Sequence, residues 1–234
     1  MKVNYELNEE LLQDCINIAT GLFHPLEGFM SSSDYHSVVN DMLLSNGEVW
    51  TIPIGLDLEH DTYIKVADLN ILYLSYKSKN IGYIEIDDCY MIDIEEDIIK
   101  IFGTDDIAHP GVKKELSRSK YRVGGKVVIT DESILKGSLK PEDTKAYFKN
   151  KNWKTIAGFQ TRNPIHKAHE HLQRVALDIC DALFINPLVG WKKAGDFSEE
   201  AVVDGYTTMI EEYYTGLNVY FDTLKTPMRY AGPK

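Results

Sequence analysis

The sequence predicts two domains of different class, a β-rich first part and an α/β second part with a parallel sheet. Between Glu48 and Asp93, short runs of β-branched and aromatic residues recur with a period of two, separated by polar turns. Beyond Lys154, strand-like and helix-like segments alternate, which is typical of parallel strands joined by helices. We therefore expect domains at 1–150 and 151–234.

The charge divides at the same boundary. The chain has 234 residues and a net charge of −11. Residues 1–150 hold 15 Lys and Arg against 26 Asp and Glu, whereas residues 151–234 hold ten of each. The acidic first part disfavours nucleic acid as a partner, because it repels phosphate. The second part has no net charge, so it does not repel anions and could contain a local anion-binding site.

The chain shows no sequence sign of membrane insertion or secretion. Its apolar runs are short, and residues 1–10 lack the apolar core of a signal peptide. Cys15, Cys89 and Cys180 are widely spaced and odd in number, which argues against a disulfide framework. These features predict a cytoplasmic protein with no membrane partner.

In the first part, two amphipathic helices are expected before the strands. Asn8 begins the first and Ser32 the second, and the segment 21–28 with Pro25 separates them. The period-two runs predict strands at 49–58, 62–67, 71–76 and 81–94, followed by helices near 95–102 and 111–119 and a strand near 126–130.

In the second part, Pro141 lies one residue inside a helix that is expected to link the domains. The alternation that follows predicts strands at 154–159, 182–189 and 218–221 and helices at 165–180 and 198–214. Ligands on such sheets bind outside the carboxyl ends of the strands.

Four polar residues follow the first of these strands: Gln160, Thr161, Arg162 and Asn163. Pro164 then suits the first position of a helix, where amide groups and the helix dipole favour an anion. The planar guanidinium of Arg162 suits an oxyanion. Asn163 could also serve as the helix cap, so an alternative is that residues 160–163 form only a polar turn that caps the helix.

His166 and His169 are three residues apart in the expected helix and share one face, so both rings can point at one phosphate. Two alternatives remain open from the residues alone. The pair could be surface histidines, or with His171 it could hold a metal. The metal reading is disfavoured because no cluster of Cys or carboxylates supplies further ligands.

Two more polar segments follow the later strands. Lys192 and Lys193 come after the second strand, where solvated loop charges are the simpler reading. Arg229 follows the third strand and is expected near the same carboxyl edge as Arg162. The Gly-rich dinucleotide motif, the P-loop and the Gly-x-Ser-x-Gly nucleophile motif do not occur.

Several blocks of the sequence resemble the ATP sulfurylase (sulfate adenylyltransferase) family. GFQTRNPIHKAHEHL is similar to its Gln-Thr/Val-Arg-Asn-Pro-x-His-x-x-His signature. FINPLVGWKKAGD and PMRYAGPK resemble two later blocks, and HPLEGFM with WTIPIGLDL resembles blocks of the first part. The resemblance runs from about Gly21 to Lys234.

The resemblance implies a PUA-like β-barrel domain followed by a Rossmann-like nucleotidyltransferase domain. It implies the reaction of ATP with sulfate to adenosine 5′-phosphosulfate and pyrophosphate, with Mg²⁺ accompanying ATP, and a homo-oligomer at full length. By resemblance, Thr161, Arg162 and Asn163 would be catalytic, and His166 and His169 would stabilise the phosphates. Gln160 to Asn163 and Arg229 would bind substrate.

The chain departs from the family's sequence in two places. Asn186 stands before Pro187, where the family usually has His. The family also continues beyond the Met-Arg-Tyr-Ala-Gly-Pro block into a further strand and loop, so residues 151–234 would be the first half of its catalytic domain. We therefore expect sulfate adenylyltransferase activity that the missing part impairs. The alternatives are a non-catalytic protein that binds nucleotide, oxyanion or a partner chain, and a nucleotidyltransferase for another acceptor.

Overall fold

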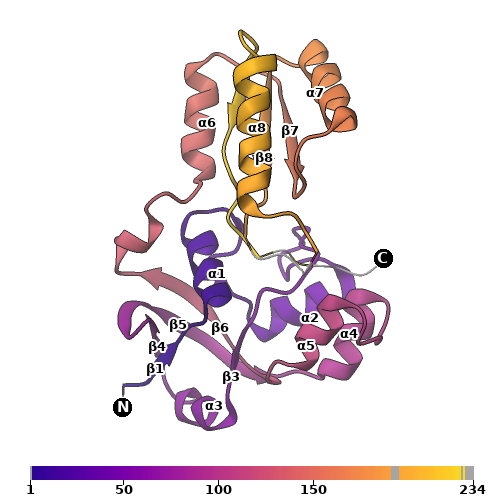
Figure 1. Ribbon diagram of the computed structural model, residues 1–234. Helices are drawn as coiled ribbons and strands as arrows, with labels where there is room; N and C mark the ends of the chain where they lie inside the picture. Colours follow the sequence, from indigo (N-terminus) through magenta and orange to yellow (C-terminus); the bar gives the residue numbers. More distant parts are fainter. Residues whose placement is uncertain (1, 191–194, 228, 230–234) are drawn as a thin grey trace. The chain divides into compact units, whose positions relative to one another are not determined.

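The computed structural model describes residues 2–190, 195–227 and 229. The chain forms two compact units, one of residues up to Lys136 together with Arg229 and one that begins at Gly137 (Figure 1). The sequence placed the boundary after Asn150 instead. Helix α6 (Pro141–Asn150) belongs to the second unit because Phe148 packs on Phe184 and Tyr220 of that unit's sheet, with ring centroids 5.6 and 5.5 Å away.

A six-stranded sheet forms the centre of the first unit. Its strands pair in the order β1-β4-β5-β6-β2, and β3 also pairs with β6. All these pairs are antiparallel except β1 with β4. The strands are β1 (Asn4–Glu6), β2 (Gly28–Phe29), β3 (Leu56–Leu58), β4 (Ile71–Tyr76), β5 (Lys79–Met91) and β6 (Tyr121–Ile129). The β-rich first part is therefore confirmed.

Five helices and one 3-10 turn surround this sheet in the described part of the first unit: α1 (Glu9–Ala19), α2 (Ser32–Asp41), α3 (His60–Val66), α4 (Ile94–Phe102), α5 (Pro110–Leu116) and η1 (Glu132–Leu135). The predicted cap of the first helix is confirmed, since the Asn8 side chain accepts a hydrogen bond from the Leu11 amide at 2.8 Å. α4 and α5 pack together through Ile98, Phe102 and Val112 (Figure 1).

Two strand predictions were wrong in the first unit. Residues 62–67 fall in helix α3, where Tyr63 and Val66 are three positions apart and turn toward the core. The ring of Tyr63 lies 4.9 Å from that of Tyr121 on β6. The strand predicted at 49–58 is reduced to β3. Burial on the sheet overrides the local β propensity in α3.

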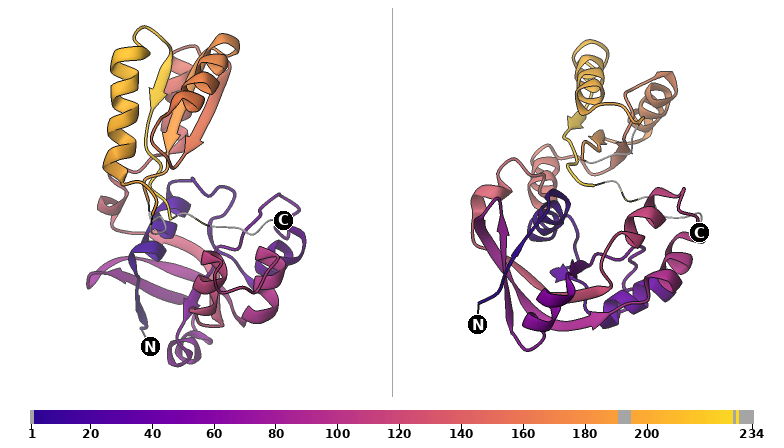
Figure 2. Two further views of the ribbon diagram at one scale, coloured as in Figure 1. Left: turned by 45° about the vertical axis from the view of Figure 1, so that its right-hand side comes forward. Right: turned by 60° about the horizontal axis from the view of Figure 1, so that its bottom comes forward.

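The second unit is a three-stranded parallel sheet in the order β7-β8-β9, as predicted. Its strands are β7 (Ile156–Thr161), β8 (Ala182–Pro187) and β9 (Val219–Phe221), joined by α7 (Lys167–Ile179) and α8 (Glu199–Tyr213). Figure 2 shows α7 and α8 on one side of the sheet and α6 on the other. The core under α8 contains Leu183, Ile185, Val202 and Tyr206.

No helix within the described residues is long and apolar enough to cross a lipid bilayer. The three cysteines are free, and Cys15 is buried.

Candidate functional site

The predicted site begins within strand β7, because the strand runs to Thr161 and not to 159 as expected. Successive side chains of a strand point to opposite faces, so Gln160 is exposed while Thr161 is buried. The Thr161 hydroxyl accepts a hydrogen bond from the Asn163 amide at 3.1 Å. This contact turns the chain directly after the strand.

Helix α7 begins at Lys167, two residues later than predicted, and Pro164 is not its first residue. Residues 164–166 belong to no helix or strand, and Pro164 and Ile165 lie directly against Gly205 of α8. His166 occupies the cap position, but its side chain makes no capping hydrogen bond. The amide groups at the start of α7 therefore donate no hydrogen bond to that side chain.

The two histidines of the motif come together although only His169 lies in the helix. Their rings are stacked, with centroids 3.7 Å apart and planes at 28°. His166 is exposed, whereas His169 is half-buried, and its Nδ1 lies 3.3 Å from the hydroxyl of Tyr206 on α8. Burial and the neighbouring His166 lower the pKa of His169, which favours the neutral ring near pH 7.

Arg162 lies in the turn between β7 and α7, next to an acidic residue of the following loop. Its Nε is 3.9 Å from the carboxylate of Asp196. Both side chains are partly buried, with 32% and 11% of their surface exposed. Arg162 thus brings a guanidinium to the carboxyl end of β7, where a bound anion would meet it.

Arg229 lies in the first unit and not with the other predicted residues. Its Nη2 donates to both carboxylate oxygens of Asp14 on α1, at 2.6 and 2.7 Å. Its guanidinium also lies 5.5 Å from the ring centroid of Phe23. Burial raises the pKa of Asp14, and Arg229 opposes this rise. The predicted residues Gln160 to His169 thus lie in one continuous segment after β7, in which the two histidines are in contact. The substrate-binding role of Arg229 stays a prediction. Lys192 and Lys193 lie outside the described residues.

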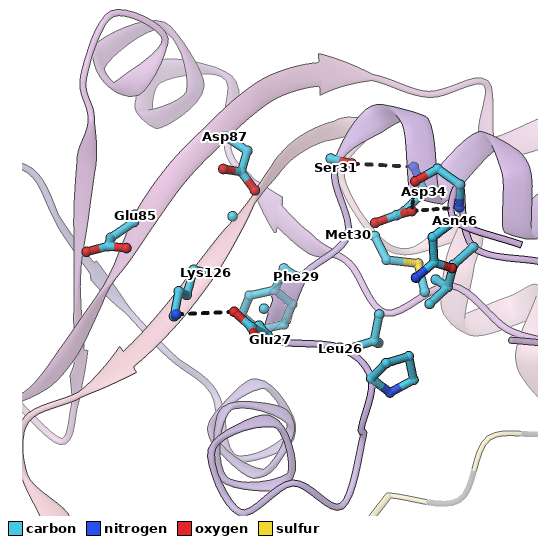
Figure 3. Close-up of a pocket in the computed structure, with 15 residues that line it drawn as sticks. Leu26, Glu27, Phe29, Met30, Ser31, Asp34, Asn46, Glu85, Asp87 and Lys126 are labelled. Carbon is cyan, nitrogen blue, oxygen red and sulfur yellow. Dashed lines mark hydrogen bonds and ion pairs between the residues drawn. The ribbon is translucent and has the colours of Figure 1, made fainter. Parts of the chain in front are cut away.

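A separate recess in the first unit has an acidic lining. It has a volume of about 400 Å³ and lies between β2, β5, β6 and the start of α2 (Figure 3). Glu27, Asp34, Glu85 and Asp87 contribute carboxylates, and Lys126 pairs with Glu27 at 3.1 Å. None of the predicted site residues lines it, and its charge disfavours an anion.

Three residues that support the cluster were not identified from the sequence. Tyr206 and Gln173 belong to the buried faces of α8 and α7, where the sequence pattern indicates only core. A fully buried Gln in a helix is itself a signal, since such a polar side chain needs a partner. Asp196 lies between β8 and α8, more than 30 positions beyond Arg162, so the sequence pattern around either residue does not indicate their pairing.

Comparison with known proteins gives the same two-part division. The family model described as a PUA-like domain matches residues 2–132, and that described as ATP-sulfurylase matches residues 136–234. Three curated relatives named sulfate adenylyltransferase come from Ignicoccus hospitalis, Pyrococcus abyssi and Carboxydothermus hydrogenoformans, at 42%, 41% and 38% identity. These matches cover 99%, 94% and 94% of this chain and 62%, 58% and 59% of the relatives. The chain thus spans about three fifths of their length.

A solved structure, the hexameric APS kinase from Thiobacillus denitrificans, shares the fold at a TM-score of 0.69 and 18% identity, over 97% of this chain and 42% of that chain. The chain thus combines a PUA-like domain with a parallel α/β unit whose first strand is followed by a His-x-x-His pair. The chain belongs to the ATP-sulfurylase family, as the resemblance of its motifs implied.

Proposed function

We propose that the chain is part of a sulfate adenylyltransferase, which converts ATP and sulfate to adenosine 5′-phosphosulfate and pyrophosphate. In this reaction a sulfate oxygen attacks the α-phosphorus, the bond from that phosphorus to the bridging oxygen breaks, and pyrophosphate leaves. Sulfate is a poor nucleophile, so the protein's task is to align the reactants and to neutralise developing negative charge.

The observation that carries the proposal is the anion-binding character of the cluster after β7. Arg162, the stacked pair of His166 and His169, and the start of α7 lie within one short segment. A guanidinium, two imidazoles and helix amides all favour bound oxyanions. ATP and sulfate both present such oxyanions.

The residue roles in this proposal are those that the family resemblance implies. Gln160 and Arg162 bind sulfate, and the segment 160–163 also contacts the ATP phosphates. Thr161, Arg162 and Asn163 are the catalytic set. Since the Thr161 hydroxyl already accepts from the Asn163 amide, its contribution includes holding the turn in shape. His166 and His169 stabilise the phosphates that leave as pyrophosphate.

Mg²⁺ enters this proposal with ATP. The described residues contain no group of three or more His, Cys, Asp or Glu side chains arranged to hold a metal ion. The ion would be bound through the phosphate oxygens of the nucleotide, where it would offset their negative charge. Gln160 offers an amide oxygen on the exposed face of β7.

The proposal extends to location and assembly. The reaction needs ATP, which places the enzyme in the cytoplasm, where its cysteines stay reduced. We also expect a homo-oligomer for the enzyme at full length. The name of the Thiobacillus structure describes a hexamer of that protein. A non-catalytic binding protein is the weaker candidate, because the curated relatives are named as transferases.

The test is sulfate-dependent release of pyrophosphate from ATP by the gene product as the cell makes it. Arg162→Ala is expected to abolish this release, because it removes the only guanidinium in the segment 158–172. Arg174→Ala is the matched control. It removes the same charge from the exposed face of α7, where Arg174 pairs with Glu170 and lies 5.2 Å from the ring centroid of Tyr214. Undiminished release in Arg162→Ala would overturn the assignment.

A further inference from the structure

A buried polar network lies directly beneath His169. Tyr206 of α8 is completely buried, and its hydroxyl contacts Nδ1 of His169 at 3.3 Å. Gln173 follows His169 by one helical turn of α7 and is also completely buried. Its Oε1 accepts a hydrogen bond from Tyr214 at 2.8 Å. α7 and α8 thus join through polar groups at the point where the catalytic ring is held.

The surroundings of the Tyr206 hydroxyl determine how it can act. Burial raises its pKa to about 12, and hydrogen bonding by Gln173 and Thr161 partly offsets the rise. The phenol therefore keeps its proton at any working pH. A protonated phenol has one O–H group to donate. His169 Nδ1 is the ring nitrogen in reach of that O–H group.

A buried polar network at this place stabilises the fold less than apolar side chains of the same shape would. Burying a hydroxyl or an amide costs free energy that an apolar side chain would not incur. The Nε2 atom of Gln173 has no hydrogen-bond partner of good geometry among the described residues. Phe at 206 and Leu at 173 would fill the same volume without that cost. Stability of the fold therefore does not account for the Tyr206 hydroxyl, whereas its contact with His169 Nδ1 does.

We infer that Tyr206 is a positioning residue for His169: its hydroxyl donates to Nδ1 and so holds the neutral ring with its proton on Nε2. In that tautomer Nε2–H can donate to an acceptor oxygen. His166, stacked at 3.7 Å on the ring of His169, limits the ring's rotation further. Burial and His166 lower the pKa of the His169 ring, and the backbone of Pro164 partly opposes this effect. That the acceptor is a departing phosphate rests on the proposed function.

The first test needs no substrate. In the ¹⁵N-labelled 234-residue chain, long-range ¹H–¹⁵N spectra report which nitrogen of His169 is protonated, with His169→Asn identifying its signals. We expect the Nε2–H tautomer in the unaltered chain and a mixture of tautomers in Tyr206→Phe. Phe retains the ring and its packing, and unchanged amide spectra of β7 and β8 verify the fold. Tyr213→Phe, exposed on the same helix, is the matched control and leaves His169 unchanged.

A second measurement separates this inference from the proposed function. Inorganic pyrophosphate is titrated into the same samples, and Tyr206→Phe is expected to bind it about 3- to 10-fold more weakly, the value of one ordinary hydrogen bond. If the tautomer responds to Tyr206→Phe but pyrophosphate leaves both histidines undisturbed in the unaltered chain, the inference holds and the proposed function fails. The inference is overturned if His169 is protonated on Nδ1, or if Tyr206→Phe leaves its tautomer as it was.

Discussion

At the scale of single residues, the contact between Arg162 and Asp196 sets the charge that an incoming anion meets. A carboxylate 3.9 Å from the guanidinium reduces the local positive potential before ligand arrives. The distance is too long for a hydrogen bond, so the contact is mainly electrostatic. Asp196 therefore lowers the affinity for a small anion and does little to orient Arg162.

We predict that Asp196→Asn tightens the binding of sulfate by about 3- to 10-fold, because an opposing charge at about this distance is worth roughly 1 kcal/mol even with the full screening of water. Isothermal titration calorimetry with sulfate at constant ionic strength measures the change. Asp178→Asn removes an equal charge from the exposed end of α7 and serves as control. Weaker binding in Asp196→Asn would mean that the carboxylate orients the guanidinium.

How far the sequence predicts the site depends on how local each contact is. Gln160 to His169 were found because all the groups lie within ten residues of one another. The partners Tyr206 and Asp196 were missed because they come from α8 and from a loop far along the chain. Arg229 was expected beside Arg162 because both follow strands. Arg229 and Asp14 are 215 positions apart in the sequence, so no local pattern indicates that they pair.

At the scale of elements, the end of strand β8 depends on the absence of a side chain. Leu188 forms a bridge with Leu224, and the next turn brings Gly190 against the backbone of Thr226. A Cβ added at Gly190 would lie 1.9 Å from the Thr226 carbonyl oxygen. At Gly158 on β7, by contrast, an added Cβ would meet nothing within 4 Å.

We predict that Gly190→Ala destabilises the second unit by about 1–3 kcal/mol, the usual cost of forced overlap in packed structure. Gly158→Ala should leave stability nearly unchanged. Hydrogen exchange of the β8 amides, followed by mass spectrometry, measures the difference, with exchange expected to be about 10-fold faster or more in Gly190→Ala. Equal exchange in both variants would show that the backbone at Thr226 yields without cost.

The predictions of the elements succeeded where periodicity and caps agree. The three parallel strands and the two crossover helices were all identified, because the strands are buried apolar runs between polar turns. The start of α7 was placed too early, since Pro164 commonly begins helices. Here Pro164 and Ile165 pack instead against Gly205 of α8 before the helix begins, a contact that only the folded unit reveals.

At the scale of the whole molecule, the share of the relatives' length that the chain spans bears on turnover. Relatives are matched over about three fifths of their length, and the second unit contains a sheet of only three strands. The anion cluster lies on β7, at one edge of that sheet. Alignment of ATP with sulfate needs contacts on both substrates, so binding of phosphates is expected to survive better than catalysis.

We predict that the 234-residue chain alone binds pyrophosphate but shows weak or no turnover. Molybdate-dependent production of AMP from ATP measures turnover directly, since the mixed anhydride with molybdate hydrolyses. The gene product as the cell makes it is the positive control. Rates of about 1 s⁻¹ or more, within the ordinary range of enzymes, from the 234-residue chain would contradict the prediction.

Arg229→Ala is expected to destabilise the first unit by about 3–5 kcal/mol at pH 7, because it leaves the buried Asp14 carboxylate without its cation. The loss should shrink as the pH falls. The pKa of Asp14 is raised in the fold, so the folded state takes up a proton before the unfolded chain does, and acid relieves the cost of the buried charge. Urea unfolding at pH 7 and pH 4.5 measures both effects. In a background of Asp14→Asn, Arg229→Ala should cost little, and an equal loss there would contradict the pairing.

The contact of Arg229 with Asp14 also makes the first unit a discontinuous domain, assembled from the beginning of the chain and from a residue beyond its second unit. A gene fragment that stops at Lys136 would encode all six strands of its sheet, yet it would leave a carboxylate in an apolar interior with no counter-charge from Arg229. Anyone who clones the PUA-like domain by itself should therefore carry Asp14→Asn in the expression plasmid, and compare the yield of folded protein with and without that change.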